Sequence, residues 1–344
     1  MDELIKLEIS DDSSTPKYKQ VVRSIISNIE AENIRYGQKL PSINQLSFDY
    51  FLSRDTVEKA YIELRERGII ESVKGKGYYV RNTKPDSRLK VLVLFNKLSS
   101  YKKVIYNQLA HLLGEKADID FFIYHCNYDL FERILKERLK GYNYYILMPH
   151  FISLDVARFK RLLADIPKEK ILLLDQKIED IHHYHGLIYQ DFKKDIHDAL
   201  HGALDRIKKY KELILVFPEN QNYPYPKDIL LGFREFCSLH DLPFHVINEV
   251  TQQTEIKPNA AYVIIEENDL VSLIKRARQL GLRLGKDLGV LSYNDTPLKE
   301  VLEDGISVIT TDFIKMGTQA AEMILENKWR QAKNDFKLIV RNSL

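Results

Sequence analysis

The stretch from Leu40 to Val80 constrains the fold of this chain more than any other part of its sequence. Ser42 is placed to cap a short helix that ends near Tyr50, and Ser53 is placed to cap a longer one. Apolar residues recur along the longer helix at the spacing of one buried face: Val57, Ala60, Tyr61 and Leu64. A strand over 69–73, a glycine-bearing turn and a strand over 78–80 follow. With the apolar helix over 18–33 ahead of it, this order predicts a winged helix-turn-helix.

Length and composition set the bounds for the rest of the chain. With 344 residues it exceeds a typical single domain, so we expect two or three compact units. Hydrophobic residues make up 44% and charged residues 29%, which excludes a mainly disordered chain. The formal net charge of +2 is too small to indicate a nucleic-acid binder by itself. Any contact with DNA must therefore come from a local patch.

Two expectations concern the surroundings of the chain. Cys126 and Cys237 lie among apolar residues without metal-ligand spacing, so both are expected to be buried thiols. The acidic N-terminus does not resemble a secretory signal, and no apolar run reaches membrane-spanning length. We therefore expect a cytoplasmic protein with no membrane contact, and we predict no cofactor.

Cationic residues gather on the elements that would face a duplex. In a helix-turn-helix the first turn of the second helix enters the major groove, which makes Arg54 the best donor to guanine or to a phosphate. Ser53 and Thr56 are short enough to bond the DNA backbone. At the turn of the hairpin, Lys74 and Lys76 would contribute salt-sensitive, nonspecific binding.

The pattern LPS, a short helix, SR-x-TV and then G-x-G before an aromatic residue and Val resembles the DNA-binding domain of the GntR family of transcription regulators. Two positions depart from that family: Asn44 stands where many relatives have arginine, and Glu58 where several have another arginine. Glu58 either points away from DNA or reads a cytosine amino group. Together, the residues and the resemblance give this set of DNA-contact candidates: Ser42, Asn44, Ser53, Arg54, Thr56, Lys59, Lys74, Gly75, Lys76 and Gly77.

A second pattern begins after a polar, proline-bearing segment over 82–88, which we interpret as a linker between domains 1–81 and 89–344. Short apolar runs such as KVLVLF (90–95) and KILLL (170–174) alternate with helical segments such as 104–116 and 192–210. Strands buried on both faces and separated by helices predict parallel sheets built from βαβ units. The number of strands indicates an α/β domain with two lobes.

Residues 89–344 resemble the LacI-type, periplasmic-binding-protein-like effector domain (type I). Several short segments carry this resemblance: LD at 174–175, QDF at 190–192, GF at 232–233, GLRLGKD at 281–287, SYND at 292–295, ITTD at 309–312, MG at 316–317, AA at 320–321 and VRNS at 340–343. The resemblance implies a ligand-controlled regulator whose effector is a small sugar or sugar phosphate bound between the lobes. It also implies that Gln190, Asp191 and Asp295 face the cleft.

Polar residues stand at the carboxyl ends of the expected strands, where ligands bind in open α/β sheets. Carboxylates and amides can engage vicinal hydroxyls, and aromatic rings can cover the apolar face of a sugar. The effector-contact candidates are Asn96, Lys97, His150, Asp175, Gln190, Asp191, Tyr223, Lys227, Asn294 and Asp295. Ile229 stands where LacI-type relatives commonly have an arginine, and Lys227 nearby is a candidate to substitute for it.

Three other features leave alternatives open. The histidines at 182, 183 and 185 suggest a metal site, but no partner ligand stands at a matching spacing, so a loop or cleft edge is favoured. The tyrosines at 142, 144 and 145 fit strand packing better than a stacking platform. In the segment over 220–226, the sequence favours neither contact nor absence of contact between the ligand and Tyr223 or Tyr225.

Taken together, the sequence predicts a homodimeric transcription regulator, most simply a repressor of a carbohydrate-utilisation operon. Two readers related by symmetry would bind a pseudo-palindromic double-stranded DNA operator. The alternative is a sugar-binding or sugar-modifying enzyme domain with a vestigial winged helix. No motif for a catalytic nucleophile, a phosphate loop or a metalloprotease supports it, and 89–344 is short for the aminotransferase-like domain of some GntR proteins.

Overall fold

The computed structural model describes residues 5–10, 15–81, 88–219 and 223–344. The chain divides into two compact units, residues 1–88 and 89–344. The expected linker at 82–88 lies outside the described residues except for Arg88.

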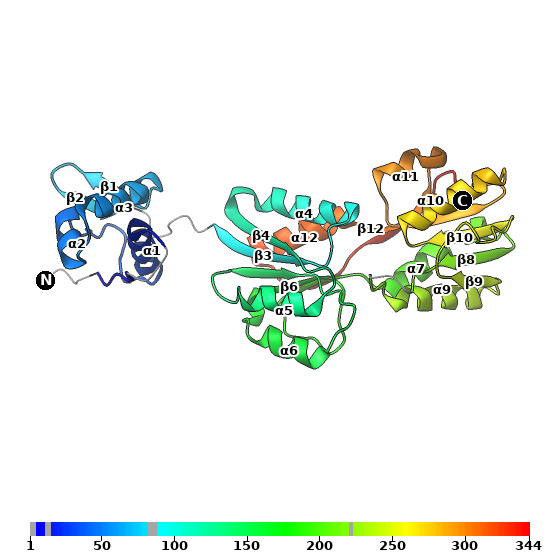
Figure 1. Cartoon of the computed structure of the whole chain (residues 1–344), viewed down its shortest axis with the longest axis horizontal. Helices are drawn as coiled ribbons and strands as arrows, with labels where there is room; N and C mark the ends of the chain where they lie inside the picture. Colours follow the sequence, from blue (N-terminus) through cyan, green and yellow to red (C-terminus); the bar gives the residue numbers. More distant parts are fainter. Residues whose placement is uncertain (1–4, 11–14, 82–87, 220–222) are drawn as a thin grey trace. The chain divides into compact units, whose positions relative to one another are not determined.

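The first unit is a winged helix-turn-helix (Figure 1). Its elements are α1 (Lys17–Glu30), α2 (Ile43–Asp49), α3 (Arg54–Glu66), β1 (Ile70–Val73) and β2 (Gly77–Val80). The two strands pair antiparallel with Val73 opposite Gly77, so the turn between them spans residues 74–76. The predicted apolar face of α3 is buried against α1 and the hairpin. We call this unit the reader.

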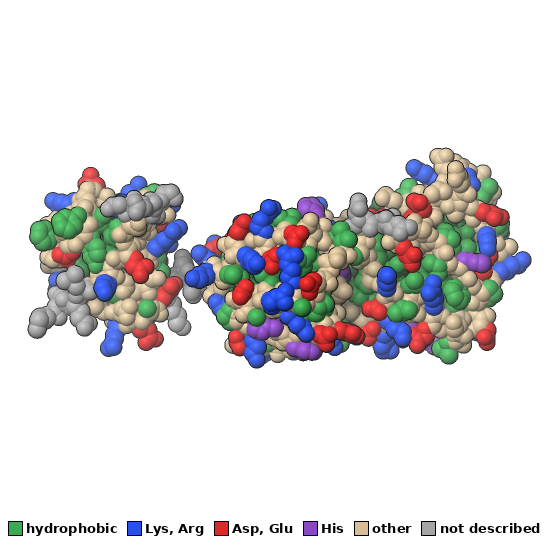
Figure 2. Space-filling view, turned by 60° about the horizontal axis from the view of Figure 1, so that its bottom comes forward, with side chains coloured by type: hydrophobic (Ala, Val, Ile, Leu, Met, Phe, Trp, Pro, Cys, Tyr) green, Lys and Arg blue, Asp and Glu red, His purple; other side chains and the backbone are tan. Residues whose placement is uncertain are grey.

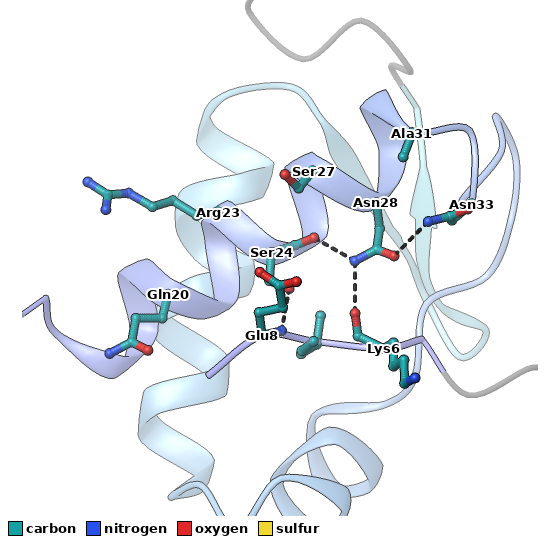
Figure 3. A pocket seen from close by; sticks show the side chains of 10 residues that line it. Lys6, Glu8, Gln20, Arg23, Ser24, Ser27, Asn28, Ala31 and Asn33 are labelled. Atoms are coloured by element: carbon teal, nitrogen blue, oxygen red, sulfur yellow. Dashed lines mark hydrogen bonds between the residues drawn. The ribbon is translucent and has the colours of Figure 1, made fainter. Parts of the chain in front are cut away.

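An extended segment over residues 5–10 runs along α1 and is held by side chains rather than by a neighbouring strand. Asn28 donates to the carbonyl of Lys6 at 2.9 Å, and the Oγ of Ser24 accepts from the backbone of Glu8 at 2.8 Å. Figure 3 shows the hollow of about 720 Å³ beside this seam. The side chains of Asn28 and Ser24, both on α1, bond to the backbone of the extended segment, so we interpret this hollow as a packing seam.

The second unit contains two six-stranded sheets, one in each of two lobes (Figure 1). In the first lobe the strand order is β13-β7-β6-β5-β3-β4, and every pairing is parallel. These strands are β3 (Leu89–Phe95), β4 (Ala117–Ile123), β5 (Tyr144–Leu147), β6 (Ile171–Asp175), β7 (Gly186–Tyr189) and β13 (Gln331–Lys333). Its helices are α4 (Ser100–Leu113), α5 (Tyr128–Lys136), α6 (Val156–Ala164) and α12 (Phe313–Glu326).

The second lobe has the strand order β14-β12-β11-β10-β8-β9. Its strands are β8 (Glu212–Val216), β9 (Phe244–Ile247), β10 (Ala260–Ile264), β11 (Gly289–Tyr293), β12 (Ser307–Thr311) and β14 (Phe336–Ile339). Its helices are α7 (Phe192–Gly202), α8 (Leu204–Ile207), α9 (Lys227–Leu239), α10 (Glu267–Gln279) and α11 (Pro297–Val301). The expectation of parallel sheets is correct except for β14, which pairs antiparallel with β12 because the chain returns from the first lobe before forming it.

Two details refine the expected elements. The predicted helix over 192–210 is two helices, because α7 ends at Gly202 and Ala203 leaves helical geometry before α8 begins. Helices α7 and α9 pack so closely that a Cβ on Gly232 would lie 2.1 Å from the carbonyl oxygen of Lys193. The strands β6, β10, β11 and β12 are buried along their whole length, as expected for strands covered on both faces.

The chain crosses between the lobes three times: after β7, after β12 and after β13. These crossings lie side by side, because the backbone of Asn334 donates to Tyr189 at 2.7 Å and that of Asp312 donates to Asp335 at 2.9 Å. Three adjacent crossings allow two packed lobes to rotate about one line, which is the arrangement of a hinge. The carboxyl ends of strands from both sheets meet at the cleft beside it.

Candidate functional site

The reader presents the first turn of α3 as a capped and exposed helix end. The Oγ of Ser53 accepts from the backbone of Thr56 at 3.2 Å and lies 2.8 Å from its hydroxyl. This cap satisfies one of the free N–H groups of the helix start, so the turn is ordered before any ligand binds. Arg54, the next residue, is exposed and makes no ion pair within the described part of the chain.

The hairpin presents two cations in the same way. Lys74 and Lys76 are exposed on the turn, and the backbone of Lys76 donates to Val73 at 2.9 Å. Gly75 has a φ of 75° and Gly77 a φ of 108°, and residues other than glycine rarely adopt these backbone angles. A tight turn that carries two ammonium groups can approach a phosphate backbone closely.

Tyr61 fixes the hairpin and α3 to each other. Its hydroxyl donates to the carbonyl of Pro41 at 2.8 Å, and its ring packs edge-on against Tyr78 with centroids 4.8 Å apart. Burial raises the pKa of Tyr61 above its usual range, so the hydroxyl stays a donor. The start of α2, helix α3 and the hairpin therefore form one rigid surface.

The other DNA-contact candidates on the reader differ in whether their side chains already have partners. Asn44, Glu58 and Lys59 are exposed, and Ser42 caps α2 by accepting from Gln45 at 3.1 Å. The ammonium of Lys59 lies 4.3 Å from the centroid of the Tyr18 ring, so it is partly engaged by α1. The contacts of all ten candidates with DNA remain predictions.

In the second unit, side chains from both lobes line one cleft. The first lobe and the crossings contribute Tyr101, Lys102, His150, Asp175, Gln190 and Phe313. The second lobe contributes Phe192, Tyr223, Tyr225, Pro226, Ile229, Ile265, Tyr293 and Asn294. Five of the ten effector-contact candidates thus meet in one place: His150, Asp175, Gln190, Tyr223 and Asn294.

Asp175 is the centre of the polar groups in this cleft. Its carboxylate lies 2.8 Å from Nε2 of His150 and 3.4 Å from the ammonium of Lys102, and it accepts a hydrogen bond from Gln190. Burial raises the pKa of Asp175, but the charge of Lys102 and the bonds from His150 and Gln190 outweigh this effect and hold the pKa below its usual range. Burial and the charge of Lys102 lower the pKa of His150, so the imidazole is neutral at pH 7.

Lys102 and Tyr293 line the cleft although neither is among the candidates from the sequence. The side chain of Lys102 is only 2% exposed, and its ammonium donates to Asn96 at 2.6 Å as well as pairing with Asp175. Its place in the sequence carried a signal, because it stands three residues before Ile105 and seven before Leu109 on the buried face of α4. A lysine on the apolar stripe of a helix needs a buried partner.

Tyr223 occupies much of the cleft. Its ring stacks against His150 with centroids 6.3 Å apart, and the ammonium of Lys97 lies 3.5 Å from its centroid. The cavity that remains measures about 40 Å³, which is roughly the room of one water molecule. A sugar therefore requires the lobes to open or Tyr223 to move.

The other five candidates are not part of the cleft lining. Asn96 accepts from Lys102, and Lys97 lies over the Tyr223 ring, so both contact residues that line it. Asp295 accepts two hydrogen bonds from the guanidinium of Arg341, at 2.9 and 2.8 Å. Asp191 caps α7 through the backbone of Lys194, and Lys227 is exposed at the start of α9. Ile229, in the position of the missing arginine, does line the cleft.

The remaining sequence features have structural roles. His183 bonds to the carbonyl of Ile166 at 2.8 Å, and His185 packs on Trp329. Within the described ranges, no three His, Cys, Asp or Glu side chains are grouped as metal ligands would be. Tyr145 is buried in the core, as predicted, and both cysteines are buried. None of the described helices combines the length and apolarity needed to cross a bilayer.

Residues 17–80 match the model of the bacterial regulatory proteins of the gntR family, and residues 207–343 match that of a periplasmic binding protein-like domain. The arabinose metabolism transcriptional repressor of Geobacillus stearothermophilus is 22% identical to this chain and aligns over 96% of it and 98% of the repressor. The HTH-type transcriptional repressor YtrA of Bacillus subtilis is 36% identical over 114 residues, which cover 33% of this chain and 84% of YtrA.

Among solved structures, a LacI family transcriptional regulator from Enterococcus faecium with bound ribose shares the fold. It has a TM-score of 0.59 at 13% identity and covers 74% of this chain and 98% of its own. These relatives are transcription regulators, which favours the regulator over the enzyme alternative. The chain belongs to the GntR family of bacterial regulatory proteins, and it is a DNA-binding transcription regulator whose second unit has the periplasmic-binding-protein-like fold.

Proposed function

We propose that this chain is a cytoplasmic, homodimeric repressor of a carbohydrate-utilisation operon, and that a small sugar in the interlobe cleft releases it from its operator. The observation that carries this proposal is the cleft itself, where polar and aromatic side chains from both lobes meet beside a three-crossing hinge. The names of the arabinose repressor and of the ribose-bound regulator point to the same class of ligand.

The hinge supplies the coupling. A ligand that contacts both lobes favours the arrangement in which those contacts are made, so it shifts the population of lobe positions. In a dimer, a change in lobe position alters the spacing of the two readers and so the fit to two half-sites. Allosteric couplings of this kind are typically about 1 to 3 kcal/mol, or roughly 5- to 150-fold in affinity.

The test is binding of the full-length chain to DNA from upstream of its own operon, followed by fluorescence anisotropy. Arg54→Ala should reduce specific affinity by roughly 5- to 150-fold, since one bidentate base contact contributes about 1 to 3 kcal/mol. Arg65→Ala, on the last turn of the same helix, is the matched control and should bind like the wild type. Equal affinity of the Arg54 variant and the wild type would refute the assignment of α3 as the recognition helix.

Sedimentation of the full-length chain tests the dimer. A monomer at operator-saturating concentrations would contradict the symmetric arrangement of two readers. A thermal-shift screen against monosaccharides and sugar phosphates tests the effector, because a saturating ligand stabilises the folded state that binds it.

A further inference from the structure

We propose that the cleft selects an uncharged sugar and rejects phosphorylated or acidic ones. This inference rests on the proposed function, and it deepens that function by choosing between the two classes of effector that the fold accommodates. Its basis is the state of the charged and uncharged polar groups around the cleft.

The charged groups that line the cleft already have partners. Asp175 is paired with Lys102, and that lysine also donates to Asn96. His150 is uncharged at pH 7, and its Nε2 is hydrogen-bonded to the same carboxylate. The cluster therefore contains one cation and one anion, both buried, and has no net charge to offer a ligand.

Two cations of the next layer, Lys333 and Arg341, are paired with carboxylates as well. Behind Tyr293, the carboxylate of Asp195 lies 2.6 Å from the ammonium of Lys333. Beyond Asn294, Arg341 holds Asp295 in a two-bond pair. These cations are committed to carboxylates of the protein, so a phosphate would have to displace an existing pair.

Two polar atoms in the lining lack a partner, and neither carries a charge. They are Oε1 of Gln190 and the hydroxyl oxygen of Tyr293, both buried. Buried polar atoms without partners are uncommon in folded proteins, and their bonds are usually completed by water or a ligand. An amide oxygen and a phenol hydroxyl suit the hydroxyl groups of a neutral sugar.

The walls support the same class of ligand. The rings of Tyr101 and Phe313 stack with centroids 5.1 Å apart. The rings of Tyr223 and Tyr225 pack edge to face with centroids 4.6 Å apart. Aromatic faces suit the apolar C–H surface of a sugar ring, but they solvate a dianion poorly. Two further cations lie close to the lining: Lys299 donates to the carbonyls of Tyr293 and Asn294, and the ammonium of Lys97 lies over the Tyr223 ring. Burial lowers the pKa of Lys97, so the surroundings of this side chain disfavour its charged form.

Matched pairs of ligands test the inference with the full-length chain. Calorimetric titrations would compare D-ribose with ribose 5-phosphate, D-glucose with glucose 6-phosphate, D-fructose with fructose 6-phosphate and L-arabinose with its 5-phosphate, alongside other neutral aldoses and the hexuronates. The expected result is a neutral sugar that binds at least about 100-fold more tightly than its phosphate ester, because an uncompensated buried ion costs several kcal/mol.

The outcomes separate this inference from the function it rests on. Equal or tighter binding of a phosphate ester or a uronate would overturn the inference and leave the sugar-controlled regulator standing. Loss of that binding in Lys97→Gln would then identify Lys97 as the phosphate contact. If no carbohydrate of either class binds, the sugar-effector function itself fails, whatever the charge of the site.

Two variants test the unpartnered atoms once a neutral sugar binds. Tyr293→Phe and Gln190→Leu should each weaken it about 5-fold, since a neutral hydrogen bond contributes about 1 kcal/mol. Tyr210→Phe, also a buried tyrosine of the second lobe, is the matched control and should leave the affinity unchanged. Wild-type affinity in both cleft variants would show that the sugar does not use these atoms and would overturn the assignment.

Discussion

The reader and the cleft use charged side chains in opposite ways. On the reader, Arg54, Lys74 and Lys76 are exposed, and within the described residues their side chains form no ion pair. In the cleft, Lys102 and Asp175 are buried and bonded to each other and to neighbouring residues. Figure 2 shows both acidic and basic side chains on the visible face of each unit.

This difference separates two kinds of recognition. Free surface cations attract a polyanion over a distance, and that attraction weakens as salt is added. A buried and neutralised cluster cannot attract ions, but it can hold a few hydrogen-bonding atoms in fixed positions. Loss of one charge should therefore weaken DNA binding on the reader, whereas in the cleft it should destabilise the fold.

The largest expected effect is from Lys102→Met. Removing this cation leaves Asp175 buried without its ion pair, which should lower the free energy of unfolding by about 3 to 5 kcal/mol. Urea denaturation of the full-length chain measures the change, and Lys103→Met, an exposed neighbour on α4, should be nearly neutral. A similarly small loss in both variants would show that the cleft charges are not a structural pair.

The next effect depends on pH and concerns Lys299, whose ammonium donates to the carbonyls of Tyr293 and Asn294 at the cleft edge. Burial lowers its pKa to about 8, although Glu267 opposes the shift. Between pH 8 and about 10.4 the unfolded chain then binds more protons at this site than the folded chain, so stability rises with pH.

Relative to Lys299→Met, the wild type should therefore gain up to about 3 kcal/mol of unfolding free energy across that window. Parallel urea titrations at pH 7.5 and 10 measure the difference between the two proteins. A difference that does not change with pH would place the pKa of Lys299 near its usual value and contradict its burial.

A smaller effect is expected for the cap of α3. Ser53→Ala removes the side-chain acceptor for the backbone of Thr56 and should destabilise the reader by about 1 kcal/mol. Thermal unfolding measures it, with Ser72→Ala on the exposed face of β1 as the control. Equal melting temperatures for the two variants would indicate that the cap does not stabilise the helix.

The smallest effect is the salt dependence of the hairpin. Lys74→Ala and Lys76→Ala should each reduce the slope of log affinity against log salt by about 1, because each removes one phosphate contact. Anisotropy titrations at several salt concentrations give the slope, and Lys275→Ala on α10 should leave it unchanged. Wild-type slopes for both hairpin variants would mean that the wing does not touch the backbone of DNA.

The same division explains what could be predicted from the sequence. The reader follows local rules, so the caps at Ser42 and Ser53, the buried face of α3 and the glycine turn were all predicted correctly. The cleft depends on groups that are distant in the sequence, such as Lys102 and Asp175, and on competition for partners. The pairing of Asp295 with Arg341, 46 positions later, is an example that no local pattern predicts. Spacing within a sequence does not show which distant side chain pairs with a given carboxylate.

Reciprocal titration of sugar and operator decides whether the two units act as one regulator. The sugar identified by calorimetry would be titrated into the full-length chain with and without bound operator. Linkage requires the operator to lower the affinity for the sugar by the same factor as the sugar lowers the affinity for the operator. We expect this factor to lie between about 5 and 150. Equal sugar affinity in the presence and absence of operator DNA would show that the cleft does not control the reader.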